Sequence, residues 1–436
     1  MISGEIQVGS AQRSGAGTAH ESTRWALRQA VGRPRLRPVR GAPSWAQLLT
    51  LAVVVVLAQG CAGIPERNPV PAIYSAIAEV PGLPEARFWG DETSPDMKEW
   101  FAESKAHMQA RYPAIMGRKH NYLALSGGGQ DGAFGAGVLV GWTAAGTRPE
   151  FTLVTGVSTG ALIAPFAFLG SEYDTQLRDL FTKYSTKDLL KKRNILMALL
   201  ASDATASSAP LKALIAKHVD QNVLEEIAIE FRKGRMLYIG TTNLDADRPV
   251  MWNIARIAAS RVPNALELVQ DIILASASIP AVFPPVIFEV EAKGQRYDEL
   301  HVDGGVTSQV FLYPLGLDWR RVTEKLDAKG RPSVYLIRNA KLDPTWKAVE
   351  RRLRPVAGRS IAALIRTQGI GDMYRIYVGA QRDGVDYNLA YIPPEFKEES
   401  KEMFDPEYMG KLFDLGNRMA TAGFPWKDSP PGTKAP

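Results

Sequence analysis

The sequence predicts an α/β protein, a three-layer α/β/α sandwich whose central sheet is mainly parallel, followed by a mostly helical C-terminal extension. Two observations support this fold class. From residue 122 onward, short apolar runs typical of buried strands alternate with helical segments, a pattern that favours a parallel sheet covered on both faces. The composition, with 45% hydrophobic and 22% charged residues, is that of an ordinary globular protein.

The order of elements follows from apolar periodicity and from glycine and proline positions. We expect strands at 122–125, 151–157, 236–241, 251–254, 286–290, 301–303 and 333–338, with a strand-like piece at 386–392. We expect helices at 95–111, 133–145, 159–169 and 265–276, a largely helical stretch at 171–216, and helical, charged sequence from about 343 onward. This divides the chain into a leader (1–60), a proline-containing tether with a helical lead-in (61–117), a central α/β domain (118–340) and a C-terminal extension (341–436).

The leader explains the basic character of the chain. Residues 1–60 contain seven arginines and two acids, and so carry +5 of the net charge of +6. The basic pI therefore gives no argument for nucleic-acid binding. The uncharged run Trp45–Ala58 is 14 residues long, shorter than the roughly 20 residues that span a bilayer. A basic region followed by a run of this length predicts a secretory signal.

The chain's single cysteine, Cys61, follows this run and is preceded by Gly60. The arrangement resembles a bacterial lipoprotein signal, in which the cysteine becomes the lipidated N-terminus. The resemblance implies a lipid anchor without a membrane-spanning helix. Since Ala62 stands where an aspartate would suggest inner-membrane retention, it also implies the outer membrane of a Gram-negative host. The alternative is an ordinary signal peptide that leaves Cys61 as a free thiol.

A single cysteine excludes a disulfide scaffold and a cysteine-rich metal site. The five histidines form no HExxH or HxH cluster. We therefore expect no metal and no cofactor.

A glycine-rich loop follows the first predicted strand of the domain. Gly127, Gly129 and Gly132 satisfy GxGxxG between a strand and a helix, which is the context of a dinucleotide-binding fingerprint. The acid that should end the next strand is missing, and no Gly-Lys-Ser/Thr is present for a phosphate loop. The next strand ends instead in Ser158.

Ser158 is the central residue of a GxSxG sequence, flanked by Gly156 and Gly160. On a strand–turn–helix junction this motif is typical of a serine nucleophile, although a tight turn with an N-cap serine is the alternative. Consecutive glycines at Gly127, Gly128 and Gly129 leave backbone N–H groups unshielded. Such donors stabilise the oxyanion of an acyl-transfer intermediate, so the loop is better interpreted as an oxyanion hole.

A general base for Ser158 must come from elsewhere in the chain. His218 lies inside a helical run, and no late histidine stands on a loop of its own. Asp303 ends a short strand and precedes Gly304 and Gly305, so it could serve as a base directly; alone, it would equally fit a turn-capping aspartate. His301, two residues earlier on the same side of the strand, is better interpreted as structural.

Four motifs in this order resemble the patatin-like phospholipase family: SGGGxxG, GxSxG, the alanine- and serine-rich helix end 275–285, and DGG, covering about residues 118–318. The resemblance implies a Ser–Asp dyad that hydrolyses acyl esters of lipids. Ser158 would be the nucleophile, Asp303 the base, and Gly127 to Gly129 the oxyanion hole.

One residue departs from the family pattern. Asp131 stands where Arg or Lys is usual, and a carboxylate beside an oxyanion hole opposes the developing charge unless it points away. Asp131 can therefore be interpreted either as a solvated loop residue or as a functional residue, and both interpretations stay open.

The sequence thus predicts a serine lipid acyl hydrolase of the bacterial envelope that forms an acyl-enzyme, with membrane lipids as substrate and a lipid anchor in the membrane. The alternative is a non-catalytic envelope lipoprotein that retains the fold as a lipid-binding or scaffold module. A dinucleotide-dependent oxidoreductase is a distant third.

Overall fold

The computed structural model describes residues 66–433, except 95–96, 193–205 and 315. The predicted signal and Cys61 lie outside the described residues. Gly60–Pro436 form one compact unit. None of the helices in the described part of the chain is long and apolar enough to cross a membrane.

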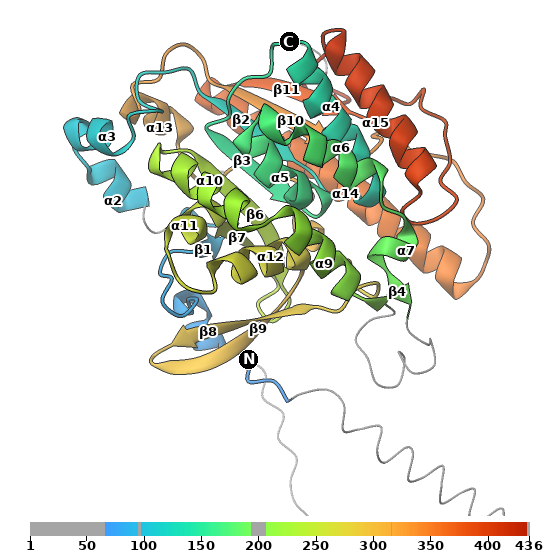
Figure 1. Cartoon of the computed structure of the whole chain (residues 1–436), viewed down its shortest axis with the longest axis horizontal. Helices are drawn as coiled ribbons and strands as arrows, with labels where there is room; N and C mark the ends of the chain where they lie inside the picture. The colour runs from blue at the N-terminus through green and yellow to red at the C-terminus, as the bar shows by residue number, and fades with distance from the viewer. Residues whose placement is uncertain (1–65, 95–96, 193–205, 315, 434–436) are drawn as a thin grey trace, which may run out of the picture. The chain divides into compact units, whose positions relative to one another are not determined.

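The centre of the fold is a nine-stranded sheet within the described residues (Figure 1). The path runs β1 (Arg87–Trp89), β7 (Arg248–Asn253), β6 (Met236–Asn243), β3 (Leu153–Val157), β2 (Asn121–Leu125), β10 (Ser333–Arg338) and β11 (Asp386–Tyr391). The hairpin of β8 (Val286–Ala292) and β9 (Gln295–Asp303) joins it through β6. Pairs from β6 to β11 are parallel, whereas those of β1, β7, β8 and β9 are antiparallel. The predicted three-layer α/β fold is confirmed, with a parallel centre inside a mixed sheet.

Helices cover both faces of the sheet. One face packs against α4 (Gly132–Ala144), α5 (Thr159–Leu169), α6 (Asp174–Thr182), α9 (Ala209–His218), α10 (Gln221–Arg232), α11 (Ile254–Ala259), α12 (Ala265–Ser276) and α15 (Pro406–Thr421). The other packs against α3 (Lys105–Arg111), α13 (Trp319–Lys325) and α14 (Leu353–Asp383).

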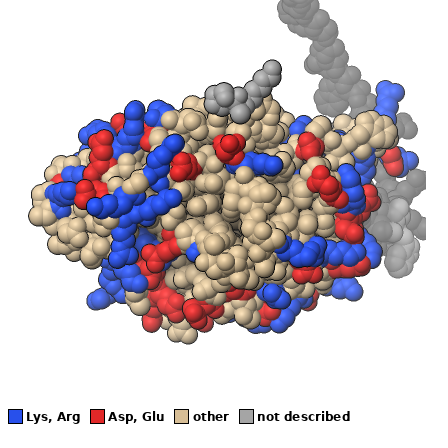
Figure 2. Space-filling model, turned by 90° about the horizontal axis from the view of Figure 1, so that it is seen from above, with Lys and Arg blue, Asp and Glu red and all other residues tan. Residues whose placement is uncertain are grey.

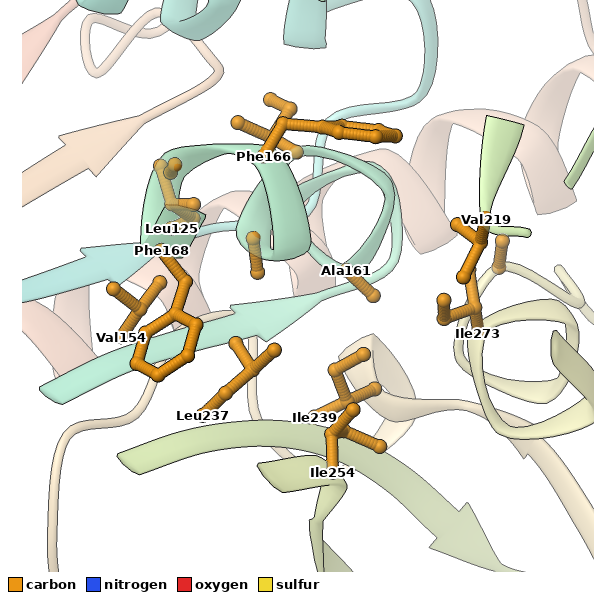
Figure 3. Packing of buried hydrophobic residues seen from close by; sticks show 14 of the residues in the cluster. Leu125, Val154, Ala161, Phe166, Phe168, Val219, Leu237, Ile239, Ile254 and Ile273 are labelled. Atoms are coloured by element: carbon orange, nitrogen blue, oxygen red, sulfur yellow. The ribbon is translucent and has the colours of Figure 1, made fainter. Parts of the chain in front are cut away.

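Side-chain alternation along the strands builds these two cores. On β2, Leu123 and Leu125 belong to the first core, whereas Tyr122 and Ala124 belong to the second, as the period of two in a strand requires. Figure 3 shows part of the first core, in which Val154 and Leu237 from neighbouring strands lie close to Phe168 of α5. The sheet is therefore buried on both sides.

Three helical predictions need correction. The expected helix 95–111 is two helices, α2 (Met97–Ala102) and α3, because Ser104 caps α3 by accepting from the N–H of His107 at 3.2 Å. The stretch 171–216 contains, besides helices such as α7 (Thr186–Leu189), the short antiparallel pair β4 (Lys191–Lys192) and β5 (Ala206–Ser207).

The helix expected from about 343 begins only at Leu353. The preceding residues run beside it, because Arg359 and Arg366 donate to the carbonyls of Thr345 and Leu342. The C-terminal residues also complete the domain: β11 is the edge strand beside β10, and α15 packs on α4.

Charges do not gather in one region of the face seen in Figure 2, where basic and acidic residues are interspersed. This agrees with a chain whose charge beyond the leader is close to neutral.

Candidate active site

Ser158 stands on a strained turn between β3 and α5. Its backbone has φ 54° and ψ −123°, a left-handed conformation that non-glycine residues adopt mainly under constraint. The flanking glycines permit the turn: a Cβ on Gly156 would lie 2.4 Å from the carbonyl oxygen of Gly160, and one on Gly160 would lie 2.4 Å from that of Leu125. The GxSxG sequence therefore forms the sharp elbow that presents a serine hydroxyl.

Ser158 and Asp303 are brought together although 145 residues separate them. The Ser158 hydroxyl donates to Oδ2 of Asp303 at 2.6 Å, and the N–H of Gly305 donates to Oδ1 at 2.7 Å. Antiparallel pairing of β9 with β6, in which Asp303 faces Thr241, delivers the carboxylate to the end of β3. Both side chains are buried.

The Asp303 carboxyl is less acidic than an ordinary aspartate. Burial raises its pKa to about 6, against the opposing effect of the hydrogen bonds from Ser158 and Gly305. A carboxylate with this raised pKa, which already accepts a hydrogen bond from the Ser158 hydroxyl, can act as the general base.

The end of α12 holds both residues in place. Ser276 accepts the N–H of Ser158 at 2.9 Å and donates to the carbonyl of Gly240 at 2.7 Å. The carbonyl of Ser278 accepts the N–H of Asp303 at 3.0 Å. In the sequence this helix end was only a motif of the family resemblance; its signal was the run of small residues before Pro280, and the individual roles of Ser276 and Ser278 were missed.

The three loop glycines predicted as an oxyanion hole are not equivalent. The N–H of Gly127 donates to the carbonyl of Gln309 at 3.0 Å, so it is not free for a substrate oxygen. The N–H groups of Gly128 and Gly129 have no acceptor among the described residues. Gly128 must lack a side chain, because its Cβ would lie 2.1 Å from the carbonyl oxygen of Asn339. The prediction therefore narrows to Gly128 and Gly129 as the available donors.

Asn339, directly after β10, clamps this loop and was missed by sequence reasoning. Its N–H donates to Oγ of Ser126 at 2.8 Å, and its side-chain amide donates to the Ser126 carbonyl at 2.9 Å. Its Oδ1 accepts the N–H of Gly135 at 3.0 Å. The only signal in the sequence was a polar residue at a strand end.

Gln309 connects the glycine loop to the loop of the base. Besides accepting from Gly127, it donates through Nε2 to the carbonyl of Gly305 at 2.6 Å. Its Oε1 accepts from Arg338 at 3.3 Å, and Arg338 also lies 3.5 Å from the carbonyl oxygen of Gly127. Arg338 is buried, which lowers its pKa to about 10. No carboxylate among the described residues lies within 4.0 Å of its guanidinium.

Asp131 is not the solvated residue that one interpretation expected. It is partly buried, and Tyr408 of α15 donates its hydroxyl to Oδ1 at 2.8 Å. Burial raises the pKa of Asp131 to about 6, opposed by the Tyr408 hydrogen bond and by the charges of Lys341 and Arg338. The carboxylate thus faces α15, with a buried cation nearby.

Neither candidate histidine contacts Ser158 or Asp303. His301 is fully buried between Thr241 (2.9 Å) and Glu299 (3.1 Å), and Glu299 is in turn paired with Arg87. His218 is 3.1 Å from the hydroxyl of Tyr184.

A small cavity of about 50 Å³ opens beside Ser158. Apart from Gly129, Gln130 and Thr159, its walls are mainly apolar: Leu162, Leu180, Phe181, Leu189, Leu211, Leu214, Ile279, Phe283, Phe404 and Met409. A larger cavity of about 530 Å³ lies on the other face of the sheet and is lined by neither Ser158 nor Asp303. Because Ser158 lines the smaller cavity and not the larger one, the smaller cavity is the candidate active site. In the described residues no group of three or more His, Cys, Asp or Glu side chains is arranged to hold a metal ion.

A comparison with known protein families agrees with this geometry. Residues 123–315 match the profile of the patatin-like phospholipase family. A comparison with curated proteins gives no match. Among solved structures, VipD from Legionella pneumophila matches with 11% identity, covering 70% of this chain and 66% of that chain, at a TM-score of 0.33. The match thus spans slightly less than two thirds of VipD, and a likeness this low does not bear on function. With the elbow, the glycine loop and the DGG turn all inside the matched range, residues 123–315 form a domain of the patatin-like phospholipase family.

Proposed function

We propose that this protein is a serine lipid acyl hydrolase, a carboxylic ester hydrolase that works through a Ser158–Asp303 dyad. The observation that carries the proposal is the 2.6 Å hydrogen bond from the Ser158 hydroxyl to Asp303, made on a strained elbow without a histidine. The family supports lipid acyl hydrolysis in general, and the dyad is our assignment for this chain.

In the proposed reaction, Oγ of Ser158 attacks the ester carbonyl and its proton passes to Oδ2 of Asp303. The carbonyl oxygen becomes an oxyanion that the N–H groups of Gly128 and Gly129 stabilise, at about 3 kcal/mol for one donor. Collapse expels the alcohol, which takes the proton from Asp303 and leaves an acyl-enzyme. Asp303 then deprotonates a water molecule that attacks the acyl-enzyme, and the proton passes from Asp303 to Oγ of Ser158 as the fatty acid is released.

The substrate class follows from the wall of the cavity beside Ser158. Leucine and phenylalanine side chains surround the position of the acyl group, and no charged residue lines it. An apolar acyl chain is favoured there because its burial gains about 0.8 kcal/mol per methylene group.

The cellular location remains a proposal from the sequence. A lipid on Cys61 would hold the enzyme at the outer membrane, close to its substrate. Replacement by Cys61→Ser should then release correctly cleaved protein from the membrane fraction, with a conservative Ser10→Ala change in the leader as the control. Unchanged membrane retention of the cleaved Cys61→Ser protein would refute lipidation as the anchor.

The experiment that tests the function joins covalent labelling to product analysis. Purified protein is treated with a fluorophosphonate serine probe, and the modified peptide is identified by mass spectrometry. The untreated protein is then incubated with mixed phospholipids, and released fatty acids are measured. Labelling at Ser158 together with fatty-acid release supports the hydrolase. Stable lipid binding without labelling or release would instead support the scaffold alternative.

A further inference from the structure

Helix α14 consists of two halves with different surroundings. In the C-terminal half, Met373, Ile376 and Ala380 are buried against the sheet. At the middle of the helix, Gln368 donates to the carbonyl of Val306 at 3.3 Å, in the turn η4 (Gly304–Val306) that follows the proposed base. The helix is therefore anchored to the domain from about residue 368 onward.

The N-terminal half projects from the domain and exposes apolar side chains. Leu353 is 85% exposed, Leu364 69% and Ile361 56%. At about 100° per residue, this exposed stripe lies roughly 140° around the helix from the stripe that the C-terminal half buries. The apolar face thus changes sides along one continuous helix, and its N-terminal part cannot reach the protein's own core.

The residues before the helix run beside this projecting half. Arg359 donates to the carbonyl of Thr345, and Arg366 donates to that of Leu342 at 3.4 Å. Trp346, on this returning segment, is 89% exposed. We call residues 346–366 the projecting hairpin; its helical end lies at the lower right margin of the molecule in Figure 1.

The projecting hairpin is strongly basic. Its residues 346–366 contain one lysine and five arginines, against a single acid, Glu350. Among the described residues, Lys347, Arg351, Arg359 and Arg366 have no carboxylate within 4.0 Å, whereas Arg352 pairs with Glu350 at 3.3 Å. At about 100° per residue, Arg359 and Arg366 lie on the side of the helix opposite to Leu353 and Leu364.

Exposed leucines on one side, arginines on the other and a neighbouring tryptophan are the features of a helix that lies in a membrane interface. We propose that the projecting hairpin docks on an anionic lipid surface. Leu353, Ile361 and Leu364 would enter the acyl region, and the basic side chains that have no carboxylate partner among the described residues would contact lipid phosphates. A protein partner is less well matched, because Lys347, Arg351, Arg359 and Arg366, which have no carboxylate partner among the described residues, favour an array of phosphates.

Docking of the projecting hairpin would also orient the candidate active site toward the membrane. Helix α14 leaves the domain at the turn that follows Asp303. Docking would therefore place the end of the sheet that carries Asp303 and Ser158 against the bilayer. This consequence rests on the proposed function, whereas lipid binding itself does not.

The test measures binding to vesicles without any lipid anchor. The chain from Ala62 onward contains every residue that the structure describes. It is sedimented with vesicles of phosphatidylcholine alone, and with vesicles in which phosphatidylglycerol replaces part of the phosphatidylcholine. The variant is the double substitution Leu353→Ser and Leu364→Ser, and the matched control is Val378→Ser, a residue 58% exposed on the anchored half of the same helix. Hydrolysis of a water-soluble ester and the thermal unfolding midpoint are measured in parallel.

We expect wild type and Val378→Ser to bind the anionic vesicles, with binding that weakens as salt is added. The double variant should need about tenfold more lipid for half-binding, while its hydrolysis of the soluble ester and its unfolding midpoint stay unchanged. Arg351→Glu combined with Arg359→Glu should also lose binding, whereas Lys293→Glu, in the exposed turn between β8 and β9, should not.

Equal vesicle binding by wild type and the leucine double variant would overturn the proposal. So would a wild-type dimer in sedimentation equilibrium that the double variant abolishes, because the face would then be an interface between copies of the chain. If wild type hydrolyses no ester yet binds vesicles as described, the proposed function fails and the docking surface stands.

Discussion

The hydroxyl of Tyr408 donates to the carboxylate of Asp131 at 2.8 Å and thereby links α15 to the start of α4, beside the glycine loop. This hydrogen bond explains how an aspartate is accommodated at a position where the family usually has arginine or lysine. The carboxylate is turned toward α15, and the buried guanidinium of Arg338 provides positive charge near the loop instead.

Changes at Asp131 should therefore affect stability more than catalysis. Tyr408→Phe removes the donor of a partly buried carboxylate and should destabilise the protein by about 1–3 kcal/mol. Asp131→Arg should destabilise it similarly, since the new cation would meet Arg338 and Lys341, and it should not raise kcat/KM. Denaturant unfolding and ester kinetics at low ionic strength measure both effects. Tyr374→Phe, whose hydroxyl bonds a carbonyl near the C-terminus, is the control. A tenfold gain in kcat/KM for Asp131→Arg would show that the carboxylate opposes the oxyanion.

Ser158→Ala should abolish ester hydrolysis and fluorophosphonate labelling. Loss of the nucleophile of a serine hydrolase costs about 10⁴-fold or more in kcat, and the small alanine side chain leaves the packing of the turn intact. The exposed Ser171→Ala serves as the control and should retain full activity. Residual labelling at another serine, with hydrolysis preserved, would remove Ser158 from the mechanism.

Asp303→Asn should nearly abolish hydrolysis, because the amide cannot accept the serine proton. His218→Ala and His301→Gln should keep a substantial fraction of activity, since the histidine rings contact Tyr184, Thr241 and Glu299 rather than the dyad. The activity of His301→Gln is compared with that of wild type at equal folded fraction, measured by circular dichroism. A histidine variant as inactive as Ser158→Ala would require a triad in place of the dyad.

The pH dependence should report the ionisation of Asp303. The base must be ionised to accept a proton, and burial raises its pKa to about 6. We therefore expect kcat/KM to be full above this value and to fall about tenfold per pH unit below it. Because Asp131 also has a pKa of about 6, Asp131→Asn is the control, and its profile should be unchanged.

Stability should change with pH in the opposite direction. The folded pKa of Asp303 lies above its ordinary value of 3.8, so the folded state holds this proton more tightly than the unfolded chain. The associated stability is present below pH ~4 and is lost as pH rises through about 6. Asp303→Asn should then be more stable than wild type at pH 8, by about 1–3 kcal/mol. Equal denaturation midpoints at that pH would contradict the raised pKa.

Gln309 should act as a positioning residue for both loops of the site. Gln309→Ala removes the hydrogen bond to Gly305 and the partner of Arg338, and we expect kcat to fall about tenfold while KM changes little. Gln309→Glu retains a partner for Arg338 but not the donor to Gly305, so it should be no better than alanine if the Gly305 bond matters. Gln221→Ala, on the exposed side of α10, is the control. A rise in KM with unchanged kcat would indicate a role in substrate binding instead.

Local sequence determined the parts of the site that are contiguous in the chain. GxSxG after an apolar run predicts an elbow, because only glycine tolerates the approach of Gly156 to Gly160 and of Gly160 to Leu125. Strand positions such as 333–338 and the helix 265–276 followed from apolar pattern alone. The family resemblance then ordered the motifs and placed Asp303 with Ser158.

Long-range pairing decided the rest, because hydrogen-bond partners separated by many residues leave no local pattern. Tertiary contacts alone determine that Gln309 occupies the donor of Gly127, that Ser276 holds the N–H of Ser158, and that Asn339 and Arg338 support the glycine loop. They also decide the orientation of Asp131, since its partner Tyr408 lies 277 residues away. The exposed stripe of α14 was equally hidden in the sequence, where apolar residues at helical spacing look alike whether a core covers them or not. Only the folded chain shows that the sheet buries the apolar side chains of one half of that helix, whereas Leu353, Ile361 and Leu364 of the other half stay exposed among the described residues.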